Sequence, residues 1–139
     1  KISSNDNSYI TKSIRHFSDN ITRPTPTPGG GSVSALSAAL GASLATMVSN
    51  LTMDKKGFEN HRELHLQSSK KLQKHKDELL LLVDEDSKSY DVVVESIRMP
   101  KKTPLEIKLR KESLYKATYN AARTPLQILK ICNMLLIII

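Results

Sequence analysis

The spacing of apolar positions predicts a chain made of helices. Ile10, Ile14 and Phe17 are separated by four and three residues, which places them on one face of a helix over roughly residues 8–19. An alanine-rich stretch predicts a second helix over residues 33–52, which we expect to be buried and central, with Ser32 as its N-cap. A third, long helical pattern covers about residues 58–98.

Two threonine–proline pairs predict later helix starts. The segment TPLE at residues 103–106 combines a capping box with proline at the first helical position, and TPLQ at residues 124–127 repeats this arrangement. Two further helices are therefore expected, over roughly residues 104–122 and from residue 125 onward. The pattern predicts one all-α domain over residues 1–139, a bundle of about five helices around the alanine-rich helix.

Composition supports this fold class. The chain has 139 residues, which is the length of one domain, and only 4% are aromatic, so its core must be aliphatic and suited to helix packing. The uncharged stretch at residues 32–53 carries too many Ser and Thr side chains for a comfortable membrane span, so we expect no membrane contact. The apolar ending ICNMLLIII suggests that further C-terminal helices are missing, because a complete domain would cover it.

Charge and cysteine content narrow the function classes. The chain has 21 Lys and Arg against 14 Asp and Glu, a net charge of +7, but its lysine-rich segments lack the aromatic residues that stack nucleic-acid bases. We therefore expect no nucleic-acid partner. The single Cys132 excludes an intramolecular disulfide and suits a reducing cytoplasm. His61 and His65 lack an evident third ligand, so no metal is expected.

Two features of the sequence favour chemistry. In the segment PTPTPGGGS, glycines 29–31 run into a helix start, where free backbone N–H groups and the helix dipole suit a carboxylate or phosphate; the alternative is a plain hinge. Asp86 interrupts an otherwise apolar helical stripe, where a carboxylate needs either a structural partner or a function as general acid or base. The stripe consists of Leu79, Val83, Asp86, Tyr90, Val93 and Ile97. Asp84 lies about 200° around the helix from Asp86, so the two should not form a pair.

Several segments, in order, resemble the cyclodeaminase family of folate enzymes. These are TPTPGGGSVSALSAALGASLATMVSNLT, DKKGFE, LLVDEDSKSYDVVVESIRMPK and ATYNAARTPLQI. The resemblance implies an all-helical domain that forms a homodimer or higher homo-oligomer. It also implies conversion of 5-formiminotetrahydrofolate to 5,10-methenyltetrahydrofolate with release of ammonia, with the tetrahydrofolate derivative, including its polyglutamated forms, as substrate.

The resemblance also assigns site residues. It implies that Asp86 acts as acid and base, that Asp84 orients a lysine or the substrate, and that Lys55 or Lys56 supplies positive charge. Folate contact is assigned to Pro28, Gly29, Gly30, Gly31, Ser32 and Lys101.

Two other functions remain open from the sequence. The same family contains methenyltetrahydrofolate cyclohydrolases, whose reaction needs much the same groups. A helical folate-binding or dimerisation module without turnover is the second alternative.

Overall fold

The described part of the chain, residues 8–138 of a computed structural model, is helical and contains no strand. Four α-helices follow one another: α1 (Ile14–Ile21), α2 (Gly30–Met53), α3 (Arg62–Arg98) and α4 (Pro104–Ile138). Two short 3₁₀ helices, η1 (Tyr9–Thr11) and η2 (Glu59–His61), precede α1 and α3. The predicted all-α class is confirmed, with four α-helices in place of five.

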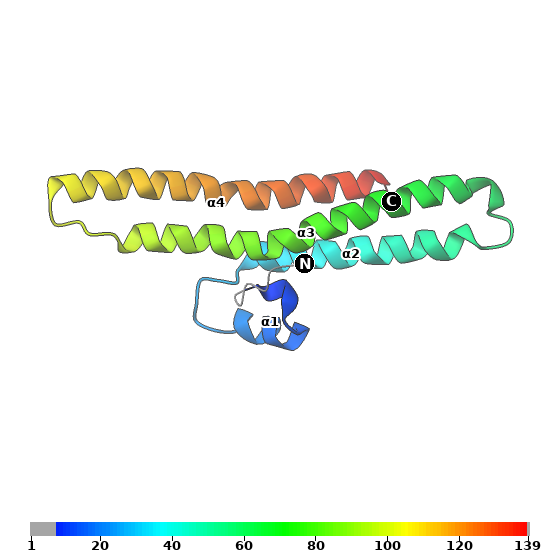
Figure 1. The fold of residues 1–139 in the computed structure, drawn as a ribbon, viewed down its shortest axis with the longest axis horizontal. Coiled ribbons are helices and arrows are strands. Elements are labelled where there is room, and N and C mark those ends of the chain that lie inside the picture. The colour runs from blue at the N-terminus through cyan, green and yellow to red at the C-terminus, as the bar shows by residue number, and fades with distance from the viewer. Residues whose placement is uncertain (1–7, 139) are drawn as a thin grey trace.

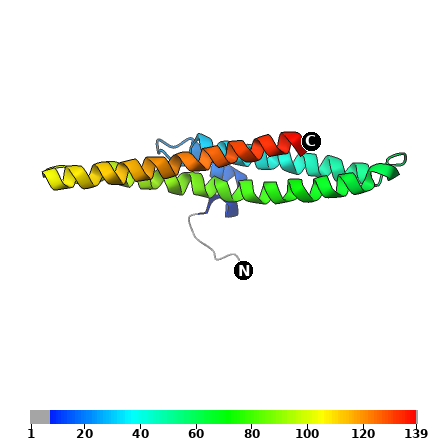
Figure 2. The same ribbon diagram turned by 90° about the horizontal axis from the view of Figure 1, so that it is seen from above.

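Helix α3 is the axis of the molecule. Helix α2 runs antiparallel along the N-terminal part of α3. Helix α4 returns antiparallel along α3 from its C-terminal end past its middle, and Ile138 lines a cavity with Leu64 and Leu72 (Figure 1). The view turned by 90° shows the same three helices side by side, so they form a long, narrow bundle (Figure 2). The prediction that the alanine-rich helix is central is therefore wrong, because α3 provides the surface on which both other long helices pack.

Helix α2 is buried along one side only. That side carries small residues at intervals of three and four, which let the α2 and α3 backbones approach closely; they are Ser32, Ala35, Ala39, Ala42, Thr46 and Ser49. The larger side chains of the helix face outward, and Leu40, Leu44, Met47, Val48 and Leu51 are each at least half exposed. The helix predicted to be buried is therefore buried along one side only, because small residues rather than leucines face α3.

The corners between the long helices follow the predicted chemistry. Gly57 takes a positive φ of 92° between α2 and α3, a conformation that residues with a side chain rarely adopt. Helix α3 ends at Arg98, just before Pro100. At the start of α4, Glu106 N donates to Thr103 Oγ1 at 3.2 Å while Thr103 N donates to Glu106 Oε2 at 2.9 Å, which confirms the first capping box.

The second predicted capping box does not begin a helix. Helix α4 continues through Thr124 and Pro125 as far as Ile138, although an interior proline costs a helix about 3 kcal/mol. Packing offsets this cost, because Ile128, Ile131 and Leu135 beyond the proline are buried in the core formed with α2 and α3. Tertiary contacts therefore override the local start signal.

The N-terminal segment also differs from its prediction. The Ser13 side chain accepts a hydrogen bond from His16 N at 3.1 Å and begins α1 there, so residues 8–19 form two short helical pieces instead of one helix. Only Phe17 of the three expected contact residues is buried, whereas Ile14 is 77% exposed. Because α1 begins only after Ser13, Ile10 lies outside it and does not share a helix face with Ile14 and Phe17.

Two of the long helices also have the length and apolar character of membrane spans. These are α2 and α4, with mean hydropathies of 1.4 and 1.3 over their most apolar stretches. Core helices of soluble proteins meet the same criterion, and both helices contribute buried residues to the bundle core.

Candidate functional site

The triglycine segment lies at the N-terminus of α2. Gly29 is the N-cap, and Gly30 and Gly31 are the first helical residues, so the predicted N-cap, Ser32, lies within the first turn. The cap of this helix comes from α3, because the Ser32 amide donates to Asp86 Oδ2 at 2.8 Å. A carboxylate at this position satisfies one of the free N–H groups and complements the positive end of the helix dipole.

Ser32 joins the two helices through its side chain. It is fully buried, and its Oγ lies 2.8 Å from the Val83 carbonyl oxygen, 3.0 Å from Ser87 Oγ and 3.2 Å from Asp86 Oδ2. These contacts fix the register of α2 against α3 at the level of Asp86. Ser32 therefore positions Asp86, and the predicted direct contact of Ser32 with folate stays a prediction.

Gly31 allows the Asp86 carboxylate to lie directly on the backbone of α2. A Cβ added at Gly31 would lie 2.0 Å from Asp86 Oδ1 and 2.4 Å from Asp86 Cγ, far inside van der Waals contact. A Cβ at Gly30 would meet no atom within 4 Å. The third glycine is thus required by the approach of Asp86, whereas the second leaves open space beside the backbone.

A cavity of about 250 Å³ opens at this helix start. It is lined by Pro26, Thr27, Gly29, Gly30, Gly31, Asp86, Ser89, Tyr90, Ala121 and Pro125. The two features that the sequence analysis found separately, the triglycine segment and Asp86, therefore meet in one cavity. Pro28, also predicted to contact folate, is buried beside the glycines.

The expected apolar stripe around Asp86 is buried only in part. Leu79, Val83 and Val93 are buried, whereas Tyr90 is 44% exposed and Ile97 is 49% exposed. Helix α2 begins opposite Asp86, so it does not cover the C-terminal part of α3 that follows Asp86. Asp86 itself is partly exposed, as a group that meets a ligand must be.

A second cavity, of about 590 Å³, lies between α3 and α4 on the other side of Ser89, which lines both cavities. Lys88 and Arg123 bring positive charge to it, Glu85 brings a carboxylate, and Asn120 and Gln127 bring amides. Sequence reasoning missed these residues, because the predicted helix break at residues 124–125 removed Arg123 from any helix face shared with α3.

Asp84 has a different environment from Asp86. Its Oδ1 accepts a hydrogen bond from the Tyr9 amide at 2.6 Å, and its Oδ2 accepts one from Ser8 Oγ. It is 8% exposed and ties the N-terminal segment to α3. Burial, together with Asp91 and Asp84, raises the pKa of the Tyr9 hydroxyl. Among the described contacts Asp84 reaches no lysine, and its predicted role of orienting a lysine or the substrate stays a prediction.

The predicted lysines lie away from the cavity. Lys55 and Lys56 follow the far end of α2, a helix of 24 residues that is about 36 Å long at 1.5 Å per residue. Lys55 Nζ lies 5.7 Å from the centre of the Phe58 ring. Lys101 is exposed between α3 and α4, beyond about 18 Å of helix from Asp86. Within one chain, none of the three reaches Asp86.

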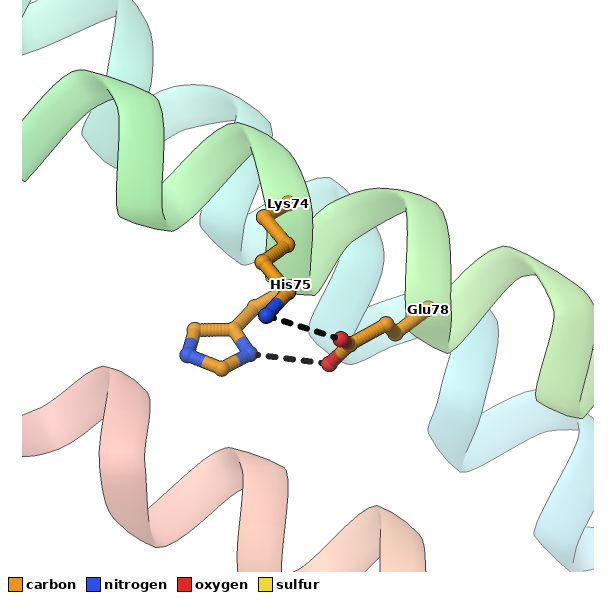
Figure 3. A network of polar contacts seen from close by, with 3 residues as sticks. All are labelled: Lys74, His75 and Glu78. Atoms are coloured by element: carbon orange, nitrogen blue, oxygen red, sulfur yellow. Dashed lines mark hydrogen bonds and ion pairs between the residues drawn. The ribbon is translucent and has the colours of Figure 1, made fainter.

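The described residues contain no group of three or more His, Cys, Asp and Glu side chains arranged to hold a metal. A smaller polar cluster lies on α3, where Glu78 accepts from His75 Nδ1 at 3.0 Å and pairs with Lys74 Nζ at 3.8 Å (Figure 3). All three side chains belong to one helix at spacings of three and four, which makes this a local helix-stabilising cluster.

The fold and the cavity define an all-helical protein in which a carboxylate of α3 faces a cavity at the glycine-rich start of α2. A sequence model of the family described as Formiminotransferase-cyclodeaminase matches residues 13–139. The chain belongs to this family, as the resemblance in its segments predicted.

Similar proteins include both reaction types named in the sequence analysis. Formimidoyltransferase-cyclodeaminase of Gallus gallus is 32% identical over 120 residues, which cover 86% of this chain and 22% of that protein. Methenyltetrahydrofolate cyclohydrolase of Methylorubrum extorquens is 31% identical over 122 residues, covering 88% of this chain and 59% of that protein. The chain thus spans less than two thirds of the length of either relative.

A solved structure shares the fold. The crystal structure of formiminotetrahydrofolate cyclodeaminase from Thermotoga maritima matches with a TM-score of 0.61 at 20% sequence identity, over 91% of this chain and 74% of that one. The named relatives are folate one-carbon enzymes, and the family assignment places this chain among cyclodeaminases and cyclohydrolases.

Proposed function

We propose that this chain carries out the cyclodeaminase reaction, converting 5-formiminotetrahydrofolate to 5,10-methenyltetrahydrofolate with release of ammonia. One observation carries the proposal: the Asp86 carboxylate is held by the Ser32 amide inside a glycine-lined cavity. Oδ2 makes the anchoring contacts, and no hydrogen bond from a described residue reaches Oδ1. A fixed carboxylate with one oxygen unbonded suits proton transfer to and from a substrate.

The reaction requires protons to move between two nitrogens of the substrate. N10 attacks the formimino carbon at N5 and forms the new C–N bond, and N10 must then lose its proton. Asp86 accepts that proton and delivers it to the formimino nitrogen. With one further proton from solvent, that nitrogen leaves as ammonia, and the bond between it and the carbon breaks.

Positive charge near the site comes from Lys88 and Arg123, which line the larger cavity together with Glu85. This cavity lies on the other side of Ser89 from Asp86, because Lys88 is about 200° around α3 from Asp86. The two cations attract the glutamate carboxylates of a folate from outside the Asp86 cavity, and further glutamates of a polyglutamated folate increase that attraction. Within one chain they lie nearer to Asp86 than Lys55, Lys56 or Lys101 do.

The cyclohydrolase reaction is the second candidate. It is supported by the Methylorubrum extorquens relative, which matches over a larger share of its own length than the chicken protein does. In that reaction water adds to the methenyl carbon and the ring opens. Asp86 would then take the proton from the attacking water in place of N10.

The first experiment is an assay of the full-length protein with both substrates. With 5-formiminotetrahydrofolate we expect the near-UV absorbance of the methenyl product to rise and one ammonia to be released per turnover. If the methenyl product is hydrolysed rapidly, its absorbance stays low although ammonia is released. If deamination itself is slow, little ammonia is released. Loss of absorbance from added 5,10-methenyltetrahydrofolate, without ammonia release from the formimino substrate, would identify a cyclohydrolase. Folate binding without either reaction would identify the non-catalytic alternative.

We also infer that the chain works as a homodimer or higher homo-oligomer. The five large apolar side chains on the outer side of α2 support this, because few soluble monomers leave such a stripe in water. Sedimentation of the full-length protein would test it, and a monomer at micromolar concentration would contradict it.

A further inference from the structure

Pro125 is the one residue of α4 that breaks a rule of helix formation and yet lies inside the helix. The local sequence predicts that it begins a helix, but α4 is continuous from Pro104 to Ile138. Its side chain is exposed, so its ring is not part of the core. Neither a helix start nor core packing therefore explains a proline here, and departures of this kind often mark functional positions.

The position of Pro125 suggests a function. Proline has no amide hydrogen, so the usual hydrogen bond from residue 125 to the carbonyl oxygen of Ala121 does not form. Residues four apart share one face of a helix, and both Ala121 and Pro125 line the 250 Å³ cavity with Asp86, Gly30 and Gly31. The missing helical bond thus lies at the cavity and not on the opposite side of α4.

We propose that Pro125 frees the carbonyl oxygen of Ala121 to accept a hydrogen bond from a substrate N–H in this cavity. The inference rests on the proposed function, whose substrate carries two N–H groups at its reacting centre, on N10 and on the formimino nitrogen. A backbone carbonyl does not take up a proton at neutral pH. It therefore orients the substrate, while Asp86 on α3 transfers the proton.

Placing the acceptor on the backbone has a physical advantage. The carbonyl oxygen is held by a helix whose far half is buried in the core through Ile128, Ile131 and Leu135. A fixed acceptor loses little conformational entropy when the substrate binds, so the hydrogen bond favours the reactive orientation. The cavity would then have a proton-transferring carboxylate from α3 and an orienting carbonyl from α4.

The test is Pro125→Ala in the full-length protein, with Pro104→Ala as the matched control. Residue 104 is the first residue of α4, where the missing N–H would have no helical partner, so the control changes the same side chain without affecting a helical bond. In Pro125→Ala the new amide should bond to Ala121 and be protected from hydrogen exchange. We expect a midpoint of chemical unfolding equal to or higher than that of the unmutated protein. The value of kcat/KM should fall about tenfold, which corresponds to about 1.4 kcal/mol.

Several outcomes would overturn the inference. One is a Pro125→Ala protein with a protected new amide and unchanged kcat/KM. Another is a variant that fails to fold, because that would show that the proline serves the helix itself. Pro125→Ser restores the same N–H with a different side chain and should show the same loss; normal activity in it would also contradict the inference.

Failure of the proposed function gives a different result. If the unmutated protein turns over neither substrate, the comparison is made on binding of 5-formiminotetrahydrofolate itself, which keeps both N–H groups. Equal affinity of Pro125→Ala and the unmutated protein would overturn only the role of Ala121. Absence of binding to both proteins would overturn the proposed function and this inference together.

Discussion

Asp84 and Asp86 lie two residues apart on α3 and make the same kind of bond in two different surroundings. Each carboxylate accepts a hydrogen bond from the backbone of a preceding segment, Asp84 from Tyr9 and Asp86 from Ser32. Asp84 is closed over by Ser8 and Tyr9, whereas Asp86 faces a cavity. The comparison shows that a carboxylate with satisfied bonds becomes a candidate for chemistry only where a substrate can reach it.

The largest difference should appear when each aspartate is replaced by asparagine. Asp86→Asn cannot take up a proton, so we expect kcat to fall by about 10²–10⁴-fold while helicity is retained. Asp84→Asn should keep kcat within about twofold of the unmutated protein. Steady-state assays with circular dichroism as the folding control would check this, and a Asp84→Asn protein that folds but loses turnover would reverse the two assignments.

The two glycines beside Asp86 sharpen the same comparison. Gly31→Ala places a Cβ where the carboxylate lies, so Asp86 must move and turnover should fall at least tenfold. Gly30→Ala meets no neighbouring atom and removes backbone freedom from the unfolded chain, so it should fold with equal or slightly higher stability. Urea unfolding and kcat of the matched pair would check both. Unchanged turnover in a folded Gly31→Ala protein would show that the position of Asp86 does not matter.

These site features were predictable to different extents. The triglycine segment and Asp86 were each visible in the sequence, because glycine at a helix start and a carboxylate in an apolar stripe both depart from local expectation. That they meet was not visible, since it depends on the register between α2 and α3, which the buried Ser32 fixes. The helical class followed from the spacing of apolar residues and from composition, and is confirmed.

Two of the mistakes share one physical cause. The break expected at Pro125 and the central position expected for the alanine-rich helix were both inferred from local sequence. Contacts between distant segments decided both: Ile128, Ile131 and Leu135 hold α4 together past the proline, and α3 takes the central place. Arg123 was missed for the same reason.

A smaller effect on activity is expected from replacing Lys88 or Arg123, the cations of the larger cavity. Lys88→Gln and Arg123→Gln should each raise KM a few-fold, more for substrates with several glutamates, and should leave kcat nearly unchanged. The matched control is Lys56→Gln, about 36 Å of helix away, which should change neither constant. If Lys56→Gln raised KM while both cavity variants did not, the folate tail would have to lie elsewhere.

The smallest effect concerns Tyr9, whose amide donates to Asp84, and its contribution to stability at high pH. The pKa of Tyr9 is raised in the folded protein, so folding favours its neutral form, and its contribution to stability is constant below pH 10 and lost as pH rises through the folded pKa. Tyr9→Phe should therefore weaken the dependence of the urea midpoint on pH between about 9.5 and 11. Parallel curves for the two proteins would exclude Tyr9 as a source of alkaline sensitivity.

The arrangement of the three long helices has a consequence for the order of folding. The α2–α3 hairpin closes from its turn near Gly57, and the α3–α4 hairpin closes from its turn near Pro100. Ser32 and Asp86 are 54 residues apart in sequence, at the end of the first hairpin farthest from its turn. Short loops close before long ones, so the first hairpin must close over almost its whole length, and the second as far as Ala121 and Pro125, before the cavity exists. Folate binding would then report that the first hairpin is complete.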